Sequence, residues 1–260
     1  MRARRGGARV SAPGIAMRVA AGIAAGVALW AGMLAALLPL PAAAQAHKHA
    51  GHGAPASGQV TPSNTPHSHQ HSFADAEKWA GVFDDPARDV WQKPHEVIQA
   101  LKLPPNAVVA DIGAGTGYFA VRLAHMVGKG RVYAVDSEPG MVKHVAERTK
   151  KAKLRNLDAV LARADDPRLP SPADLVLLVD VYHHIEGREA YFRRLQELLK
   201  PGGRIAIIDF NETSPVGPPK SARIYAPQVK AEMARAGYTL SEEHGFLPNQ
   251  FFLVFQPAKP

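Results

Sequence analysis

Short apolar runs alternate with longer amphipathic stretches through most of the chain. The first five runs lie near residues 107–112, 131–135, 157–162, 174–180 and 204–210. Stretches with helical spacing of apolar residues separate them, near 117–127, 138–151 and 188–199. A last helix is predicted over about 225–236, followed by strands over about 238–244 and 250–256. This order predicts an α/β fold, in which βαβ units build a doubly wound, mostly parallel sheet with helices on both faces.

A helical preface precedes the first apolar run, over residues 73–103. Trp79, Phe83 and Trp91 recur there at spacings of four and eight residues, and Asp84-Asp85-Pro86 ends one helix and starts the next. The aromatic side chains are expected to pack against the sheet as core. We expect a single folded domain over residues 73–260 that begins with this helical segment, 73–103.

The most informative segment follows the first apolar run. An acid, Asp111, is followed by the alternating glycines Gly113, Gly115 and Gly117 and then by a helical pattern. Glycines in a strand-to-helix turn allow positive φ and let a ligand approach the main chain closely. Asp136 ends the next apolar run, where an acid can hold both hydroxyls of a ribose. The segment therefore predicts a nucleoside-binding edge.

The spacing of the glycines narrows the choice of nucleotide. The dinucleotide-binding fingerprint has its third glycine three places after the second, where this chain has Tyr118. No Lys-Ser or Lys-Thr pair follows the turn, so a phosphate-cradling loop is unsupported. Both a nicotinamide dinucleotide and a nucleoside triphosphate are therefore disfavoured.

The segment from Asp111 to Gly117 resembles motif I of the class I S-adenosylmethionine (SAM) methyltransferases. Three later segments match the same family in the same order: Arg163-Ala164-Asp165-Asp166, Tyr182-His183-His184-Ile185 and Leu198-Leu199-Lys200-Pro201-Gly202-Gly203-Arg204-Ile205. In the last, a glycine after a helix end takes the left-handed conformation, and the proline prevents continuation. The resemblance covers roughly residues 75–258. It implies a Rossmann-like sheet of seven strands whose final strand runs antiparallel between its neighbours. It also implies that the helical segment 73–103 is a cap over the SAM pocket, where the alternative is core packing of its aromatic residues.

The resemblance also implies which residues hold SAM. Asp111 would reach the methionyl amine, Asp136 the ribose hydroxyls and Asp165 the adenine amino group. Met141 would pack on the adenine face, or else serve as an ordinary core residue of its helix. The full set of implied cofactor-binding residues is Asp111, Gly113, Ala114, Gly115, Thr116, Gly117, Asp136, Ser137, Met141, Asp165 and Asp180.

The segment after the fourth apolar run carries the candidate catalytic residues Tyr182, His183 and His184. By resemblance, this segment lies beside the transferred methyl group. An imidazole titrates near neutrality and can take a proton from the methyl acceptor. The alternative is a histidine that makes only structural hydrogen bonds. Tyr182 would line the methyl-transfer channel.

The function implied by the resemblance is SAM-dependent methyl transfer to an unidentified small-molecule acceptor. The Asn/Asp-Pro-Pro-Tyr signature of amine methylation is absent, since the matching segment is Asp180-Val181-Tyr182-His183. The proline-rich stretch 213–224 is expected to form a lid or a substrate wall. A different class of function stays open, namely a non-catalytic, exported ligand-binding or sensor protein that retains the methyltransferase fold.

Residues 1–46 have the layout of a secretory signal peptide. Arginines precede an uncharged run from Val19 to Ala46, which ends in small residues suited to cleavage. An inner-membrane anchor over residues 19–40 is the rival interpretation, because the apolar run is about 20 residues long. We expect an exported, periplasmic protein that meets a membrane only through this segment.

That segment also carries most of the excess charge. The chain has a formal charge of +8 at pH 7, and five arginines within residues 1–46 account for five of these charges, which leaves +3. The remainder has no basic run interleaved with aromatic residues, so we expect a small-molecule substrate and no nucleic-acid partner. The chain contains no cysteine, which excludes disulfides, thiolate metal sites and a cysteine nucleophile.

Residues 47–72 form a low-complexity linker rich in histidine. Its composition is too polar to bury a core, and we expect it to be disordered. His-x-His spacing suits loose binding of Zn, Cu or Ni, and the alternative is a solvated tether without bound metal. The candidate ligands are His47, His49, His52, His67, His69 and His71.

Overall fold

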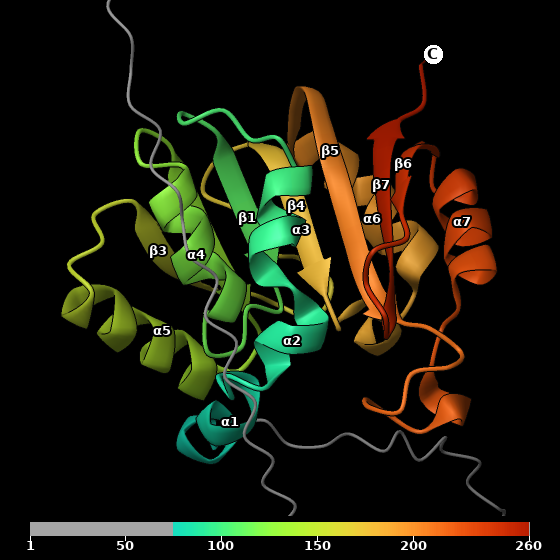
Figure 1. The fold of residues 1–260 in the computed structure, drawn as a ribbon. Coiled ribbons are helices and arrows are strands. Elements are labelled where there is room, and N and C mark those ends of the chain that lie inside the picture. Colours follow the sequence, from blue (N-terminus) through green and yellow to red (C-terminus); the bar gives the residue numbers. More distant parts are fainter. Residues whose placement is uncertain (1–74, 260) are drawn as a thin grey trace, which may run out of the picture. The chain divides into compact units, whose positions relative to one another are not determined.

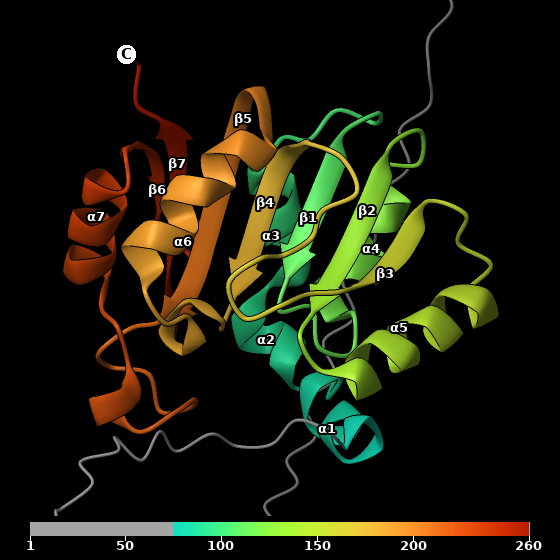
Figure 2. The ribbon, with the colours of Figure 1, turned by 180° about the vertical axis from the view of Figure 1, so that it is seen from behind.

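The computed structural model describes residues 75–259. They form one seven-stranded sheet in the order β3-β2-β1-β4-β5-β7-β6. The strands are β1 (Val108–Ile112), β2 (Arg131–Asp136), β3 (Leu157–Leu161), β4 (Ala173–Val179), β5 (Leu199–Phe210), β6 (Tyr238–His244) and β7 (Gln250–Pro257). Figures 1 and 2 show this sheet from its two faces.

Helices flank the sheet on both sides and precede it as the expected preface. The preface consists of α1 (Ala76–Phe83), α2 (Arg88–Gln92) and α3 (Pro94–Ala100). The later helices are α4 (Tyr118–Met126), α5 (Pro139–Lys151), α6 (Arg188–Leu195) and α7 (Ala226–Arg235). Short 3₁₀ turns cover Tyr182–His184, Gln196–Leu198 and Lys220–Ala222.

The strand directions confirm the expected doubly wound sheet. Strands β1 to β5 are parallel, whereas β7 runs antiparallel to both β5 and β6. The final strand in sequence therefore lies between its neighbours, as the family resemblance implied. The winding reverses between the adjacent strands β1 and β4, and ligands of such sheets bind beyond the carboxyl ends of the strands at that point.

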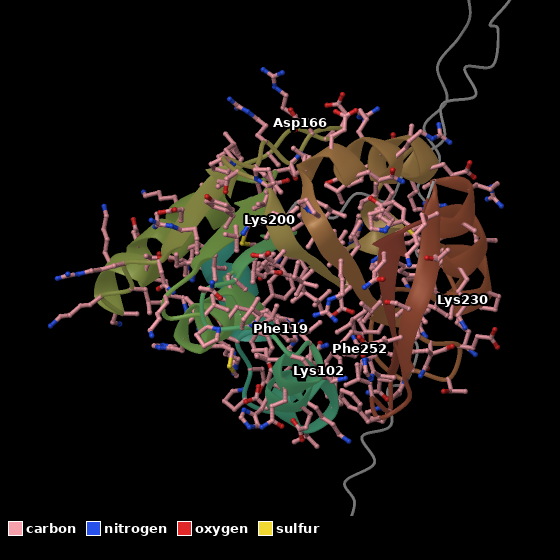
Figure 3. The ribbon with its side chains drawn as sticks, turned by 90° about the horizontal axis from the view of Figure 1, so that it is seen from above. Lys102, Phe119, Asp166, Lys200, Lys230 and Phe252 are labelled. Atoms are coloured by element: carbon pink, nitrogen blue, oxygen red, sulfur yellow. The ribbon has the colours of Figure 1, made fainter. Side chains whose placement is uncertain are left out.

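Alternating side chains of each central strand enter two separate cores. In β4, Leu175 and Leu177 pack with α3, α4 and α5, while Val176 and Leu178 pack with α6 and α7. All four side chains are fully buried, and each contributes about 1.5–3 kcal/mol of hydrophobic stabilisation. Figure 3 shows Phe119 on the side of the first core and Asp166 on the other side of the sheet. Because side chains on both faces of the sheet are buried, these strands read as continuous apolar runs.

Two connections differ from the simple βαβ pattern. The segment 162–172, which joins β3 to β4, is not helical and crosses the face covered by α6, where Leu169 packs into the second core. Helix α6 ends at Leu195, and β5 already begins at Leu199, earlier than the expected strand at 204. The pairing of β5 with β4 is therefore irregular opposite Ala173–Leu175, where Gly202 adopts φ +78°. The Pro-Gly-Gly turn is thus an irregular part of the strand rather than a simple helix end.

Several expectations fall on residues outside the described part. The signal peptide over 1–46, its rival membrane anchor over 19–40 and the histidine-rich linker over 47–72 all lie there. Within residues 75–259, no helix has the length and apolar character needed to span a bilayer. The domain bounds of 73–260 stay a prediction; the described residues begin at Asp75, and α1 begins at Ala76.

The turn before β2 offers a direct test of the packing. A Cβ on Gly130 would lie 1.9 Å from the carbonyl oxygen of Ala107, whereas a Cβ on Gly128 would have no atom within 4 Å. We expect Gly130→Ala to lower the free energy of unfolding by about 1–3 kcal/mol, because the backbone of the turn must move to make room for the added Cβ. We expect Gly128→Ala to change this free energy by less than about 0.5 kcal/mol. Urea unfolding of both variants measures this. Equal stabilities would contradict the described turn.

Candidate functional site

The glycine turn between β1 and α4 has the backbone shape predicted for ligand contact. Gly113, Gly115 and Gly117 adopt φ values of +71°, +54° and +83°, a region that side chains disfavour. The main-chain N–H groups of Gly113 and Ala114 both donate to the carbonyl oxygen of Val135, at 2.8 and 3.0 Å. The turn is thereby fixed to the carboxyl end of β2.

Asp111, the last polar residue of β1, is buried beneath this turn. Its side chain is 3% exposed, and burial raises its pKa from 3.8 to about 7, with the neighbouring Asp136 carboxylate raising it further. Among the described residues, none hydrogen-bonds to its buried Oδ2, and the same holds for Oγ1 of the buried Thr116 within the turn. Unpartnered buried polar atoms are costly, and two of them at one turn point to a polar ligand.

Asp136 ends β2 and faces the turn. Its Oδ2 accepts the main-chain N–H of Gly115 at 2.8 Å, and its Oδ1 accepts that of Glu138 at 2.9 Å. Burial raises the pKa of this carboxyl, while the two main-chain donors act in the opposite direction. Each carboxylate oxygen keeps a second lone pair, so both can accept ligand hydroxyls as well. Ser137, which follows, is exposed.

Met141 and Asp165 take different positions. Met141 lies in the first half of α5 and is 1% exposed, which suits either the core or the wall of a closed pocket. Asp165 lies in the exposed loop after β3, where its main-chain carbonyl accepts a hydrogen bond from Arg194 of α6. The structure therefore brings Asp111 and Asp136 together at the turn but does not bring the Asp165 side chain to them.

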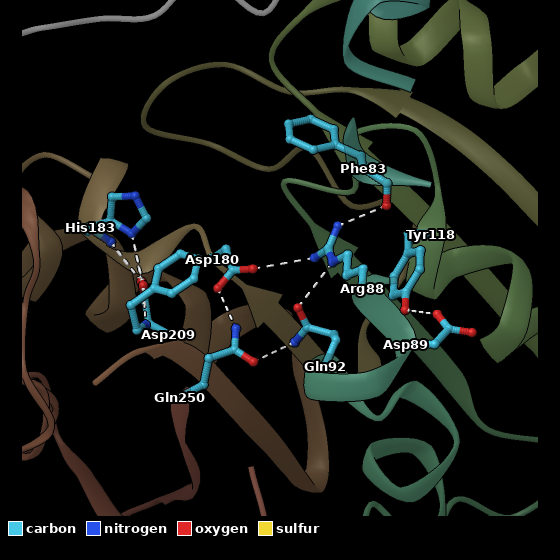
Figure 4. Close-up of polar contacts among 10 residues, drawn as sticks. Phe83, Arg88, Asp89, Gln92, Tyr118, Asp180, His183, Asp209 and Gln250 are labelled. Atoms are coloured by element: carbon cyan, nitrogen blue, oxygen red, sulfur yellow. Dashed lines mark hydrogen bonds and ion pairs between the residues drawn. The ribbon is translucent and has the colours of Figure 1, made fainter. Parts of the chain in front are cut away.

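A closed ring of polar contacts ties the preface to the carboxyl end of β4 and to the first residue of β7. Arg88 of α2 donates to Asp180 and Gln92, Gln92 donates to Gln250, and Gln250 donates to Asp180, over distances of 2.5 to 3.3 Å. We call these four residues the polar ring (Figure 4). Gln92 and Gln250 are almost fully buried, so this ring supplies partners that they could not obtain from water.

Asp180 is the acidic member of the polar ring. It follows β4 directly and adopts φ +60°. Burial raises its pKa to about 7, the Arg88 guanidinium opposes this rise, and Asp209 at the end of β5 adds to it. The Asp180 carboxyl is thus buried close to a second acid, Asp209, and Arg88 compensates only part of the resulting cost of ionisation.

Helix α1 also reaches the glycine turn. Arg148 of α5 donates to the carboxylate of Asp84 at 2.8 Å and to the carbonyl oxygen of Thr116 at 3.0 Å. The Phe83 ring lies so close to Gly115 that an added Cβ would sit 3.3 Å from it. A Cβ on Gly113 would likewise meet the Val181 side chain at 2.3 Å. Phe83 and Val181 therefore cover the turn in this conformation.

Other polar residues of the preface point elsewhere. Asp89 accepts a hydrogen bond from the Tyr118 hydroxyl and pairs with Arg122 of α4. Lys93 donates to the carbonyl oxygen of Phe246, in the connection before β7. These contacts fix α2 and the start of α3 to the domain.

The three candidate catalytic residues separate in space. Tyr182 is fully buried against Phe192, and its hydroxyl donates to Glu232 of α7 at 2.7 Å. This geometry gives Tyr182 a structural place between α6 and α7 rather than a place in a methyl-transfer channel. His184 is exposed. His183 lies beside Asp209, as Figure 4 shows, with Nδ1 at 3.0 and 2.9 Å from the two carboxylate oxygens.

Sequence reasoning missed four members of this region: Arg88 as a partner of Asp180, together with Gln92, Asp209 and Gln250. A signal for Asp209 was present, because it comes near the end of the fifth apolar run just as Asp111 and Asp136 end earlier ones. Parallel strands place such residues at one edge. The glutamines carried no comparable signal, since they pair across 158 positions of sequence.

The residues at the turn fit SAM. The unpartnered Asp111 Oδ2 and Thr116 Oγ1, the positive-φ main chain of the glycines and the remaining lone pairs of Asp136 together suit a polar nucleoside. Two surface cavities of about 440 and 370 Å³ lie elsewhere, lined by residues such as His95 and Arg122 in one and Arg188 in the other. Within residues 75–259, no cluster of three or more histidine and acidic side chains could hold a metal ion. The six linker histidines, His47, His49, His52, His67, His69 and His71, lie outside these residues.

Comparison with known proteins agrees with this geometry. Residues 109–203 match a family model described as a methyltransferase domain. The chain is 29% identical over 128 residues to a Shewanella frigidimarina protein named ubiquinone/menaquinone biosynthesis C-methyltransferase UbiE, covering 46% of this chain and 49% of the relative. The chain therefore spans about half the length of the curated relatives it matches.

Solved structures extend the similarity to most of the described residues. A SAM-dependent methyltransferase from Aquifex aeolicus superimposes with a TM-score of 0.65 at 25% identity, covering 72% of this chain and 98% of that one. The [4+2]-cyclase SpnF, at 16% identity and a TM-score of 0.55, covers 65% of this chain and 81% of its own, and shows the fold alone. The family model over residues 109–203, the Aquifex structure and the glycine turn agree in supporting a class I SAM-dependent methyltransferase domain in the described residues.

Proposed function

We propose that this protein transfers the methyl group of SAM to a small-molecule acceptor. The observation that carries the proposal is the pair of buried, unpartnered polar atoms at the glycine turn, Asp111 Oδ2 and Thr116 Oγ1. A nucleoside-bearing ligand with an amino group can satisfy such acceptors. The family model supports the same chemistry, because its matched region contains β1, β2 and β4 with their terminal acids.

The residues of the turn have distinct tasks in binding. Asp111 accepts the methionyl amine, the glycine main chain lies under the cofactor, and Asp136 accepts the ribose hydroxyls. By family resemblance, Met141 packs on the adenine face and Asp165 receives the adenine amino group after the loop that follows β3 moves. When bound, SAM supplies an electrophilic methyl carbon attached to a positively charged sulfur.

The preface encloses the reacting groups. Phe83 lies over Gly115, and Arg88 joins the polar ring to the carboxyl end of β4, so the cofactor edge is covered from one side. Cofactor entry requires this cover to move, and its return excludes water and aligns the acceptor with the methyl group. Alignment of two reactants can supply about 7–11 kcal/mol of a reaction barrier.

The acceptor is proposed to be a small molecule rather than a nucleic acid. The folded part carries no basic run interleaved with aromatic residues, which disfavours a nucleic-acid acceptor. A relative of which this chain covers about half is named for ubiquinone/menaquinone biosynthesis. His183 is the proposed proton acceptor, because its imidazole is held at the end of β4 near Asp180. Export of the protein, cleavage after residues 1–46 and metal binding by the histidine-rich linker are further proposals that rest on the sequence alone.

The proposed activity can be tested on the purified protein. Calorimetry would measure SAM binding, and SAM labelled in its methyl group would measure transfer to fractions of a metabolite extract. Binding together with label in a small-molecule fraction supports methyl transfer. Binding without label in any fraction favours the non-catalytic ligand-binding alternative, and absence of SAM binding refutes methyl transfer.

Replacing Asp136 tests the cofactor site. We expect Asp136→Ala to weaken SAM binding by about 1.5–3 kcal/mol, because it removes charge-assisted hydrogen bonds to ribose. Asp158→Ala is the matched control, since Asp158 lies on β3, is half-exposed and pairs with Arg131. Calorimetric titration of both variants gives the comparison. Unchanged affinity in folded Asp136→Ala would show that β2 does not hold the ribose.

Replacing Asp111 tests the electrostatic cost of the site. Because the folded-state pKa of Asp111 is raised to about 7 from 3.8, the folded protein loses stability as pH rises between these values. Above pH 7 a charged, buried carboxylate remains, and Asp111→Asn removes it. We expect this variant to be more stable at pH 8 by about 1–3 kcal/mol, with the gain absent near pH 4.

Thermal unfolding of Asp111→Asn at both pH values measures this effect, with Asp158→Asn as the exposed control. The same variant is expected to bind SAM more weakly, since it loses the charge opposite the methionyl amine. A variant that is less stable than the natural protein at pH 8 would contradict the assigned burial cost.

A further inference from the structure

His183 and Asp209 form a buried pair at the methyl-transfer end of the sheet. Their side chains are 5% and 2% exposed. Both carboxylate oxygens of Asp209 lie within 3.0 Å of His183 Nδ1, and Oδ2 also accepts the main-chain N–H of His183 at 3.3 Å. The main-chain N–H of Phe210 donates to Oδ1 at 2.8 Å. The Asp209 carboxylate is therefore held by the ring and main chain of His183 and by the main chain of Phe210.

This geometry decides which nitrogen of His183 carries the proton. An ionised carboxylate only accepts hydrogen bonds, so a neutral His183 must carry its proton on Nδ1. The other ring nitrogen, Nε2, then presents a lone pair. A histidine whose tautomer is set in this way by a carboxylate is oriented to take a proton through Nε2.

The pair also lies close to the predicted reaction site. Asp180 follows β4, Asp209 lies near the end of the adjacent β5, and the charges of Asp209 and His183 both act on the Asp180 carboxyl. Aromatic rings stand beside the imidazole, with Phe210 at 6.3 Å between centroids and Trp91 of the preface a further 6.3 Å from Phe210. An acceptor at this place meets aromatic surface and a proton-accepting nitrogen together.

We propose that Asp209 is a positioning residue that holds His183 as the proton acceptor, and that the methyl acceptor is a compound with an ionisable hydroxyl. This inference rests on the proposed methyl transfer. In the step, the hydroxyl proton passes to His183 Nε2, an oxygen lone pair forms the new bond to the methyl carbon, and the carbon–sulfur bond breaks with its electron pair left on sulfur. The positive charge of the sulfonium thus ends on the imidazolium, which Asp209 stabilises.

The first test measures the tautomer in the full chain, without any acceptor. Long-range ¹H–¹⁵N spectra distinguish a proton on Nδ1 from one on Nε2, and the His183 signal is assigned by its loss in His183→Gln. We expect the Nδ1–H form in the natural protein and a shift toward the Nε2–H form in Asp209→Asn. Asp174→Asn is the control. Asp174 lies at the start of β4, where it accepts hydrogen bonds from the main-chain N–H of Val108 and from Lys200. This variant should leave the His183 signal unchanged. An unchanged signal in folded Asp209→Asn would overturn the positioning role.

The second test measures transfer from labelled SAM to hydroquinone, whose hydroxyls must lose a proton, and to nicotinamide, whose ring nitrogen carries none. We expect methylation of hydroquinone only, with kcat lowered about 100-fold in Asp209→Asn and partly restored in Asp209→Glu, while the KM for SAM changes less than about twofold. Methylation of nicotinamide alone, or an equal loss in KM and kcat, would overturn the inference. Failure of SAM to bind at all would refute the proposed function, whereas the tautomer result would still decide the role of Asp209.

Discussion

The burial of negative charge at one edge of the sheet is the constraint on which the rest of this structure depends. Asp111, Asp136, Asp180 and Asp209 lie at or near the carboxyl ends of β1, β2, β4 and β5. Burial is the largest cause that raises the pKa of Asp111 and Asp180 to about 7, and each also feels a neighbouring carboxylate. Parallel strands bring these groups together, and the protein must offset their repulsion.

The preface supplies part of that compensation. Arg88 contacts Asp180, and removal of one member of a buried ion pair usually costs about 3–5 kcal/mol because the other charge remains unpaired. The rest of the compensation is left to a ligand with positive charge, which describes the ammonium and sulfonium groups of SAM. The same arrangement that destabilises the free protein therefore favours the bound state, as is common where stability and activity conflict.

Much of the fold was predictable from the sequence, because apolar periodicity and glycine spacing are local signals. The strands at 108–112, 131–136 and 173–179 fall where the apolar runs predicted them, and the glycine turn has its expected positive φ values. The polar ring was not predictable, since nothing in local sequence indicates that Gln92 and Gln250 meet. The orientation of Tyr182 was not predictable for a related reason. Its position in the sequence is near the site, but its hydroxyl donates to Glu232 of α7, far away in the sequence. The early start of β5 reflects the pairing of Leu199 with Ala173, which follows directly on the 3₁₀ turn Gln196–Leu198.

The fold alone does not determine the reaction, as its similarity to a [4+2]-cyclase illustrates. The reaction depends instead on the residues at the carboxyl ends of β1, β2, β4 and β5. The most direct measurement is calorimetric titration of the full chain with SAM near pH 6.5, repeated in buffers with different ionisation enthalpies. Positive charge placed beside carboxyls of raised pKa should drive their protons off, so the account predicts tight binding with net proton release. Binding without proton release, or no binding, would contradict it.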